Sequence, residues 1–375
     1  ITSLFTAVLV GRLIIDWWTE GKGKNLTFST PPTNNAFANA NFDFIGKRKI
    51  AYVISGTIIV LGIVSMLSRG FELGVDFKGG YSYAVEFDES ANITRDKVRE
   101  TFKAENLFGE EPSVKTFGDA NTLEITTTYM IKAAASENPD SIVLDRLYAG
   151  IVELTGKDEG FAKFAGTDEN GERSATKLTR SIKVGPTIAD DITKSSFEAG
   201  IYALLLIFLY IFIRFNKWQY SAGAVAALFH DVMIVLSIFS IFYGILPFSL
   251  EIDQAFIAAL LTVIGYSIND TVVVFDRIRE YVNSYAADSK KDLINRAVNN
   301  TISRTIITSL TTLFVVLILF LFGGSSIKGF AFALVVGIVV GTYSSVFVAT
   351  PIMHDLTGEF EAKTVEKKKS KYTKA

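Results

Sequence analysis

The sequence predicts a polytopic α-helical membrane protein with an inserted, water-soluble α+β domain. Three observations favour this fold class: long apolar runs, a charged middle section without such runs, and a biased distribution of Lys and Arg. Of the 375 residues, 49% are apolar and 20% are charged. This mixture is typical of a membrane protein that also carries a soluble region. A run of about 20 apolar residues is long enough to cross a bilayer as a helix.

The chain is expected to open with an incomplete membrane span and a linker. Residues 1–18, ITSLFTAVLVGRLIIDWW, begin inside an apolar run without an initiator Met. We expect them to be the end of a truncated transmembrane helix, with two Trp at its interfacial end. A polar linker rich in Gly, Pro and Asn covers residues 19–49, and the first complete span follows at 50–69.

Five further apolar runs predict a transmembrane bundle over residues 196–353, followed by a basic tail at 354–375. With the span at 50–69 they make six complete transmembrane helices. The expected runs are 196–213, 219–243, 254–275, 305–322 and 329–352. A charged loop is expected between the third and fourth of these runs.

Residues 70–195 predict the soluble domain. Period-two runs that indicate strands alternate with amphipathic runs that indicate helices, and Thr94 precedes the first such helix as a capping residue. The predicted order is β-α-β-β-α-β, which is the signature of a ferredoxin-like domain of two helices on one sheet.

The charged connections predict the orientation in the membrane. Basic residues gather at 47–49, at Arg214 and Lys217, across 277–304 and in the tail, and six spans place all of these on one side. The loops at 244–253 and 323–328 carry acids and a single Lys. The positive-inside rule therefore places the linker and tail in the cytoplasm and the soluble domain on the extracytoplasmic side.

The composition argues against several classes of function. The chain has no Cys and only two His, too few for a thiolate or His-based metal site. It contains no Gly-rich phosphate loop of the Walker type and no basic nucleic-acid motif. We therefore expect no cofactor, no metal, no nucleic-acid partner and no enzymatic activity.

An acid and a base in the membrane region are the leading functional candidates. Asp270 lies within the run AFIAALLTVIGYSINDTVVVF, and Arg304 stands just before TIITSLTTLFVVLILFLF. Ionisable residues in a membrane helix are functional candidates by default. Asn269 belongs to a polar stripe beside Asp270, and Thr308 lies one turn beyond Arg304. We predict a titratable carboxylate with a guanidinium partner that carries protons or ions; the alternative is a structural pair that keeps two helices in register.

Other residues receive simpler interpretations. Asp231, next to His230 in the middle of an apolar run, is expected in a buried polar network or ion path. Four residues mark the stems of the soluble domain, with a hinge expected at the second stem: Gly79, Gly80, Gly185 and Pro186. Three small residues at four-residue spacing predict close helix packing against a partner inside or outside the chain: Gly337, Gly341 and Ser345.

Six motifs, in order and spacing, resemble SecF, the smaller half of the bacterial SecD/SecF accessory complex. They are FIGKRKIAYVIS, GVDFKGG, VGPTIADDI, FHDV, GYSINDTVVVFDRIRE and NNTISRTIITSLTT, reaching from about residue 42 to residue 350. The most specific motif is GYSINDT followed by FDRIRE. The partial helix and linker in front resemble the end of a SecD half, so the whole chain resembles the carboxyl-terminal portion of a SecDF fusion.

The resemblance implies a proton-driven transporter of the RND superfamily in the bacterial inner membrane, which uses the proton motive force to drive or complete protein export. It implies that Asp270 and Arg304 belong to the proton pathway, and that the outer domain moves or contacts the emerging chain. It implies as partners the SecD half of the same fusion, a SecYEG-type channel, the translocating preprotein and membrane lipid. The family's other intramembrane Asp lies in the SecD half, so this chain is expected to hold half of the proton site. The coupling ion is expected to be H⁺, with Na⁺ left open because one carboxylate can serve either.

Two other classes of function remain as alternatives. One is a small-molecule or lipid exporter on the same fold, which would need a larger outer region with a substrate cleft. The other is a structural translocase subunit without ion coupling. In that case, neutralising Asp270 or Arg304 would leave export intact.

Overall fold

A computed structural model describes residues 9–21, 40–88, 93–118, 121–166, 174–284 and 289–358. The chain divides into two units, Ile1–Asn41 and Phe42–Ala375. In the first unit, helix α2 spans Gly11–Gly21, and Arg12 pairs with Asp16 one turn later at 3.5 Å. Trp17 and Trp18 on this helix are 75% and 55% exposed. Most of the expected linker and most of the basic tail lie outside the described residues, as do residues 1–8 of the expected truncated helix.

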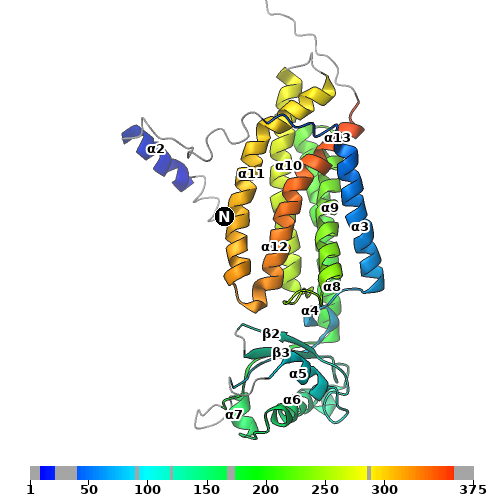
Figure 1. Cartoon of the computed structure of the whole chain (residues 1–375), viewed down its shortest axis with the longest axis vertical. Helices are drawn as coiled ribbons and strands as arrows, with labels where there is room; N and C mark the ends of the chain where they lie inside the picture. Colours follow the sequence, from blue (N-terminus) through cyan, green and yellow to red (C-terminus); the bar gives the residue numbers. More distant parts are fainter. Residues whose placement is uncertain are drawn as a thin grey trace, which may run out of the picture. The chain divides into compact units, whose positions relative to one another are not determined.

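Six helices of the second unit are long and apolar enough to cross a membrane. Figure 1 shows them running alongside one another. They are α3 (Arg48–Ser68), α8 (Pro186–Phe215), α9 (Trp218–Phe242), α10 (Gln254–Ser284), α11 (Lys290–Phe322) and α12 (Ser325–Ser344). A π-helical segment at Ser345–Ala349 joins α12 to α13 (Thr350–Leu356). The described residues therefore contain six candidate membrane spans, as the sequence predicted.

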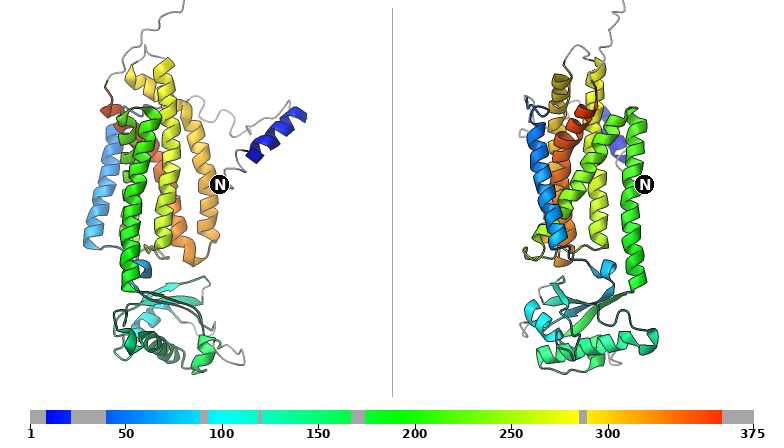
Figure 2. Two further views of the ribbon diagram at one scale, coloured as in Figure 1. Left: turned by 180° about the vertical axis from the view of Figure 1, so that it is seen from behind. Right: turned by 90° about the vertical axis from the view of Figure 1, so that its right-hand side faces the viewer.

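Three of these helices extend well beyond their apolar runs. Helix α8 begins at Pro186 rather than near 196, and Figure 2 shows it continuing past the end of the bundle to the sheet. Helices α10 and α11 together cover most of 277–304, which we expected to be a loop. Ser289 caps α11 by accepting a hydrogen bond from the Asp292 amide. The charged residues of this region therefore lie on two helical extensions.

The described residues of the inserted domain form four strands and several helices. Its strands are β1 (Gly80–Glu86), β2 (Ser113–Thr116), β3 (Thr122–Thr127) and β4 (Lys177–Val184). Its helical elements are α4 (Val75–Lys78), α5 (Arg95–Phe102), η3 (Ala135–Glu137), α6 (Pro139–Thr155) and α7 (Phe161–Ala165). Thr94 caps α5 through the Lys97 amide, as predicted.

The sheet has the order β2-β3-β1-β4, and all its neighbouring strands are antiparallel. In the middle of β1, Tyr83 lies opposite Ile125 of β3 and Ser181 of β4. Because side chains alternate across a strand, one face of the sheet is apolar and packs on α5 and α6. Phe102 and Leu147 of those helices are fully buried there. The figures place α5 and α6 on the side of the sheet away from the bundle.

The chain enters the bundle through a short segment that docks on α11. Phe44 and Ile45 are buried in front of α3, and the Ile45 amide donates to Asn295 at 3.0 Å. Lys291 and the Gly46 amide bind the Asp43 carboxylate. These hydrogen bonds, the one from Lys291 foremost, lower the pKa of Asp43 to about 2. The start of α3 is thereby fixed to the first turns of α11.

Candidate functional site

Asp270 lies on the buried face of α10 and is only 4% exposed. That face repeats at helical spacing through Ser267, Asp270, Thr271 and Val274, all of them buried. Ser309 of α11 donates a hydrogen bond to Asp270 Oδ2 at 3.2 Å. Thr342 of α12 lies 2.7 Å from the Ser309 hydroxyl. A buried carboxylate is therefore held at the meeting point of three helices by hydroxyl groups.

The expected ion pair between Asp270 and Arg304 is not formed in the described part of the chain. Arg304 is exposed on α11, whereas Ser309 of the same helix is buried. Five residues turn an α-helix by about 140°, so the two side chains leave the helix on different faces. No direct ion pair to Arg304 is therefore formed among the described residues, although the Arg304 charge still acts on the Asp270 carboxylate. The side chain that contacts Asp270 is Ser309, more than one turn further along α11.

Arg304 instead lines an open hollow of about 560 Å³ between α10 and α11. The hollow lies at the end of the bundle away from the soluble domain, and its wall is rich in charge. Asp276 in this wall binds Arg214 at 2.9 Å and Arg279 at 2.6 Å. Arg277 binds Glu280 at 2.6 Å. The hollow thus has a strongly charged wall, to which Arg304 belongs.

The other residues predicted for the pathway do not join the Asp270 hydrogen bonds. Asn269 is exposed on α10, next to Asp270 in sequence. Thr308 donates to the carbonyl of Arg304 within its own helix at 2.8 Å. The hydroxyl of Tyr266, one turn before Asp270, is buried and finds no hydrogen-bond partner among the described residues. The polar stripe of α10 therefore lies partly on the surface of the described bundle.

Asp231 forms a second buried cluster and is fully excluded from solvent. Its Oδ2 accepts hydrogen bonds from Ser267 of α10 at 2.6 Å and from Ser344 of α12 at 2.8 Å. His230 Nδ1 lies 2.9 Å from Asp231 Oδ1. A buried carboxylate with three close partners is well satisfied, because a buried charge is tolerated when it is paired and hydrogen-bonded.

The sequence analysis missed the serines and threonines that complete both clusters: Ser55, Ser267, Ser309, Thr342 and Ser344. Hydroxyl residues in membrane helices commonly bond within their own helix, so their presence alone carries no signal. Helical spacing offered one clue, because Ser267 stands one turn before Asp270 and Thr271 on the face that the carboxylate marks.

The predicted packing residues of α12 face α10. A Cβ on Gly337 would lie 2.1 Å from Val263, and a Cβ on Gly341 would lie 3.0 Å from the Ser267 Cβ. The partner of this ridge is therefore inside the chain. Ser345 belongs to the π-helical segment, and its hydroxyl donates to the Thr342 carbonyl at 2.9 Å.

The four predicted stem residues meet at one junction. Gly79 has φ +71°, and a Cβ there would lie 3.2 Å from the Val184 carbonyl and 3.6 Å from Pro186. Gly80 passes so close to β3 that a Cβ would meet the Thr127 carbonyl at 2.7 Å. Gly185 separates β4 from α8, and Pro186 occupies the first turn of α8, where proline fits without breaking the helix. Pro186 therefore lies at the start of α8 and does not interrupt this helix.

The domain also contacts the loop between α9 and α10, which sequence reasoning did not predict. The Gly74 amide donates to the Ile252 carbonyl at 2.9 Å, and the Ile252 amide donates to Glu72 at 2.8 Å. Lys115 of β2 forms an ion pair with Glu251, and both side chains are largely buried. Burial lowers the pKa of Lys115, which the negative charges of Glu72 and Glu124 partly oppose. The domain is thus bound directly to the residues that begin α10.

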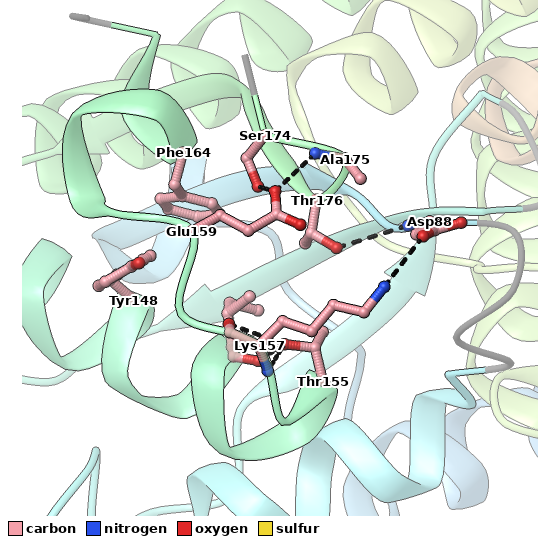
Figure 3. Close-up of a pocket in the computed structure, with 10 residues that line it drawn as sticks. Asp88, Tyr148, Thr155, Lys157, Glu159, Phe164, Ser174, Ala175 and Thr176 are labelled. Carbon is pink, nitrogen blue, oxygen red and sulfur yellow. Dashed lines mark hydrogen bonds and ion pairs between the residues drawn. The ribbon is translucent and has the colours of Figure 1, made fainter. Parts of the chain in front are cut away.

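A small cavity in the domain has no reactive constellation. It has a volume of about 180 Å³ and is drawn in Figure 3. Its polar groups bind one another: Lys157 pairs with Asp88 at 3.4 Å, and Glu159 accepts hydrogen bonds from Ser174 and from the Ala175 amide. Among the residues that the structure describes, no group of three or more His, Asp or Glu could hold a metal ion. The two carboxylate clusters in the bundle are therefore the stronger candidates.

The fold and the buried carboxylates together define a membrane-embedded transport component. The family model described as "Protein export membrane protein SecD/SecF, C-terminal" matches residues 167–359, and the model "SecD/SecF GG Motif" matches residues 64–91. The chain belongs to this family of protein export membrane proteins, on its SecF side, and is an accessory subunit of protein translocation.

Curated relatives and solved structures agree with this assignment. The protein translocase subunit SecF of Rhodothermus marinus is 45% identical over 87% of this chain and 97% of its own length. That of Haemophilus influenzae is 36% identical over 84% of this chain and 86% of its own length. The crystal structure of SecDF from Thermus thermophilus has a TM-score of 0.72 at 27% identity. The match covers 93% of this chain but only 42% of that SecDF chain.

Proposed function

We propose that this chain uses the proton motive force to drive or complete protein export, with Asp270 as the group that binds the proton. One observation carries the proposal: Asp270 is buried among three membrane-spanning helices, where it accepts a hydrogen bond from the Ser309 hydroxyl and feels the charge of Arg304 without a direct ion pair. The ionised carboxylate accepts the Ser309 hydrogen bond, whereas the protonated carboxyl can itself donate. Protonation therefore changes both the charge and the hydrogen bonding where α10, α11 and α12 meet.

The force would reach the soluble domain through α10. The amide of Gln254, at the start of this helix, donates to Asp76 of α4 at 3.0 Å. Residues just before it bind Gly74 and Lys115, so a shift of α10 along or about its axis acts directly on the domain. A second connection is α8, which joins β4 to the bundle without interruption. We propose that these two connections tilt the domain when Asp270 changes its protonation state.

The energy supplied by one proton is enough to bias a conformational equilibrium but not to shift it completely. Each proton that moves down the membrane potential supplies ~2.3 kcal/mol per 100 mV. A shift of a two-state equilibrium from 1:99 to 99:1 requires about 5.5 kcal/mol. One proton therefore biases the equilibrium between two positions of the domain, and further protons or the binding of an emerging preprotein would complete the shift.

Topology and partners follow from the same proposal. The bundle end that carries Arg214, Lys217 and the 277–304 helical extensions faces the cytoplasm, because basic residues remain on that side of a bacterial inner membrane. The soluble domain, which we assign to the ferredoxin-like class on its strand order, then lies outside the cytoplasm. The exposed polar residues Asn269 and Arg304 would contact the SecD half of a SecDF-type assembly of the RND superfamily. A SecYEG-type channel and the preprotein would be the further partners.

Export of a preprotein into membrane vesicles that contain the assembled complex tests this function. Asp270→Asn is compared with the wild type, with and without a proton gradient, after the ATP-driven step has been stopped. We expect only the wild type to respond to the gradient, and Asp270→Glu to restore part of the response. An equal response of Asp270→Asn and wild type would reject Asp270 as the coupling group and support a structural role. A gradient of Na⁺ in place of H⁺ identifies the ion.

A further inference from the structure

The His230–Asp231 pair lies at the centre of a network that joins four of the six membrane-spanning helices. Asp231 Oδ2 binds both Ser267 of α10 and Ser344 of α12, at 2.6 and 2.8 Å. Asp231 itself is on α9. One carboxylate oxygen therefore holds α10 and α12 to each other and to the helix between them.

His230 extends this network to α3. Its Nε2 lies 3.0 Å from the hydroxyl of Ser55, and that hydroxyl lies 3.2 Å from the hydroxyl of Tyr343. The Tyr343 hydroxyl donates to the Ala51 carbonyl at 3.3 Å. A consistent set of donors then runs from Ser55 to His230 Nε2 and from His230 Nδ1 to Asp231. In this arrangement the imidazole is neutral, and each donor has an acceptor. Helix α3 is the helix from which the chain enters the soluble domain.

The network lies directly beside the Asp270 site. Ser267 precedes Asp270 by three residues on α10, so the two side chains are one turn apart. Ser344 follows Thr342 by two residues on α12, and Thr342 contacts Ser309, the hydrogen-bond donor to Asp270. Asp231 thus binds Ser267 on α10, the helix that carries Asp270. It also binds Ser344 on α12, the helix whose Thr342 contacts Ser309.

Two features of the packing make this contact sensitive to small movements. A Cβ on Gly341 would lie 3.0 Å from the Ser267 Cβ, so α10 and α12 are in close contact at this level. The π-helical segment begins at Ser345, immediately after Ser344. Such wide turns are rare and often occur at functional sites, because they interrupt the regular hydrogen bonding of a helix. A change in the Ser344–Asp231 contact would therefore act on the π-helical segment, where the regular hydrogen bonding of the last span is interrupted.

We infer that His230 and Asp231 are positioning residues for the Asp270 site. Asp231 fixes the spacing of α10 and α12 so that Ser309 reaches Asp270, and His230 connects this arrangement to α3. The inference rests on the proposed role of Asp270 as the proton-binding group. It assigns no proton transfer to Asp231 and gives this second buried carboxylate a role in positioning the helices around Asp270.

The test uses two readouts on the assembled complex. One is gradient-dependent export, and the other is the infrared carbonyl stretch of protonated Asp270, identified as the band that Asp270→Asn lacks. Ser344→Ala and Asp231→Asn each weaken or remove the hydrogen bond between Asp231 and Ser344 of α12. Ser237→Ala is the matched control, because this buried serine of α9 donates to the Met233 carbonyl of its own helix at 2.6 Å and has no other hydrogen bond among the described residues. If Asp231→Asn fails to assemble, Ser344→Ala carries the test by itself, because it removes a single hydroxyl.

We expect Ser344→Ala to shift the Asp270 band and to lower gradient-dependent export roughly tenfold, equivalent to about 1.4 kcal/mol. Ser237→Ala should change neither. Ser55→Ala should leave the Asp270 band in place yet reduce export, because it breaks only the connection to α3. If Ser344→Ala and Asp231→Asn leave the band and gradient-dependent export unchanged, the pair merely stabilises the bundle and the inference is wrong. A gradient response in Asp270→Asn would instead reject the proposed function itself.

Discussion

Ser309 donates a hydrogen bond to Asp270 at 3.2 Å, whereas Arg304, five residues earlier on the same helix, is exposed. The buried carboxylate is therefore held by a hydroxyl within this chain, and the guanidinium is available to a different partner. Because Ser309 contacts Asp270 and Arg304 does not, substitutions of these two residues are expected to have different effects.

Removing the Ser309 hydroxyl should weaken ion coupling without unfolding the bundle. A hydrogen bond to a charged group contributes about 1.5–3 kcal/mol, and Ser309→Ala leaves the ionised Asp270 without its described donor. We expect a loss of gradient-dependent export of about tenfold or more, measured beside gradient-independent export. Ser309→Thr keeps a hydroxyl and should retain most of the response. Full activity in Ser309→Ala would show that this hydrogen bond is dispensable.

Arg304 should matter to the assembled complex more than to the stability of this chain. It is exposed and forms no ion pair with Asp270 in the described structure, so Arg304→Gln should change the unfolding free energy by less than about 0.5 kcal/mol. Export by the complex should nevertheless fall, because the guanidinium would face the partner half. Thermal unfolding in detergent and vesicle export are measured on the same preparation. Strong destabilisation of the isolated chain would contradict the exposed position.

The Lys115–Glu251 ion pair should hold the domain to the bundle. Both side chains are largely buried, at 12% and 17% exposure, so Lys115→Ala leaves a carboxylate without its partner. Breaking a buried ion pair typically costs about 3–5 kcal/mol, whereas replacing both partners with apolar residues can be neutral. Hydrogen exchange of β2 and of residues 244–253 should therefore rise in Lys115→Ala and return toward wild type in Lys115→Met/Glu251→Met. Unchanged protection in the single variant would mean that backbone contacts alone hold the domain.

Asp253 should make the start of α10 sensitive to pH. Burial raises the pKa of Asp253, against the lowering effect of its hydrogen bond from the Phe256 amide at 2.7 Å. A carboxyl whose pKa is higher in the folded state than in the unfolded chain favours the folded state most when it is protonated. Its contribution is present below the usual value of about 4 and is lost as pH rises through the raised folded value. Protection of the 250–257 amides, corrected for intrinsic exchange, should decrease over that window.

A matched variant isolates Asp253 in that experiment. Asp253→Asn cannot ionise and should flatten the pH dependence while keeping an acceptor for the Phe256 amide. A pH dependence that survives in Asp253→Asn would reject Asp253 as its source and point to a different titrating group near the start of α10.

Close packing of α12 on α10 should be intolerant of added volume at Gly337. A Cβ there would lie 2.1 Å from Val263, and overpacking of this kind costs about 1–3 kcal/mol. Gly265→Ala on α10 is the control, because a Cβ at that position meets nothing within 4 Å. Thermal unfolding should show a lower midpoint for Gly337→Ala only. Equal midpoints would mean that the two helices can separate at little cost.

The sequence was sufficient to predict the six apolar helices, the strands of the inserted domain and the presence of a carboxylate in a membrane-region helix, because each depends on a strong local signal. Six apolar runs, period-two strands and a carboxylate in hydrocarbon can all be recognised without tertiary information. The helical extensions of α8, α10 and α11 were missed because their charged residues suggested loops, although charged helices are stable outside the membrane. Asp231 was predicted to lie in a buried polar network, but its partners Ser267 and Ser344 were not predicted.

The partners of Asp270 could not be predicted from the chain alone. Arg304 was the obvious choice because opposite charges attract over longer distances than hydroxyl groups do. Which face of α11 is turned toward Asp270 depends on how that helix packs against α10 and α12, and no local pattern encodes this packing. The same limit applies to Lys115 and Glu251, which are far apart in sequence and meet only when the domain has folded onto the α9–α10 loop.

The most direct test of the central claim measures whether the protonation state of Asp270 moves the soluble domain. The chain has no Cys, so Lys103→Cys in the domain and Lys217→Cys at the far end of the bundle can be spin-labelled uniquely within it. Distances are recorded in the assembled complex at low and high pH, for the wild type and for Asp270→Asn. The account predicts a pH-dependent change of the distance distribution in the wild type, and a distribution in Asp270→Asn that stays at the protonated-state position. A shift of equal size in both proteins would show that the domain responds to a different titrating group and would contradict the claim.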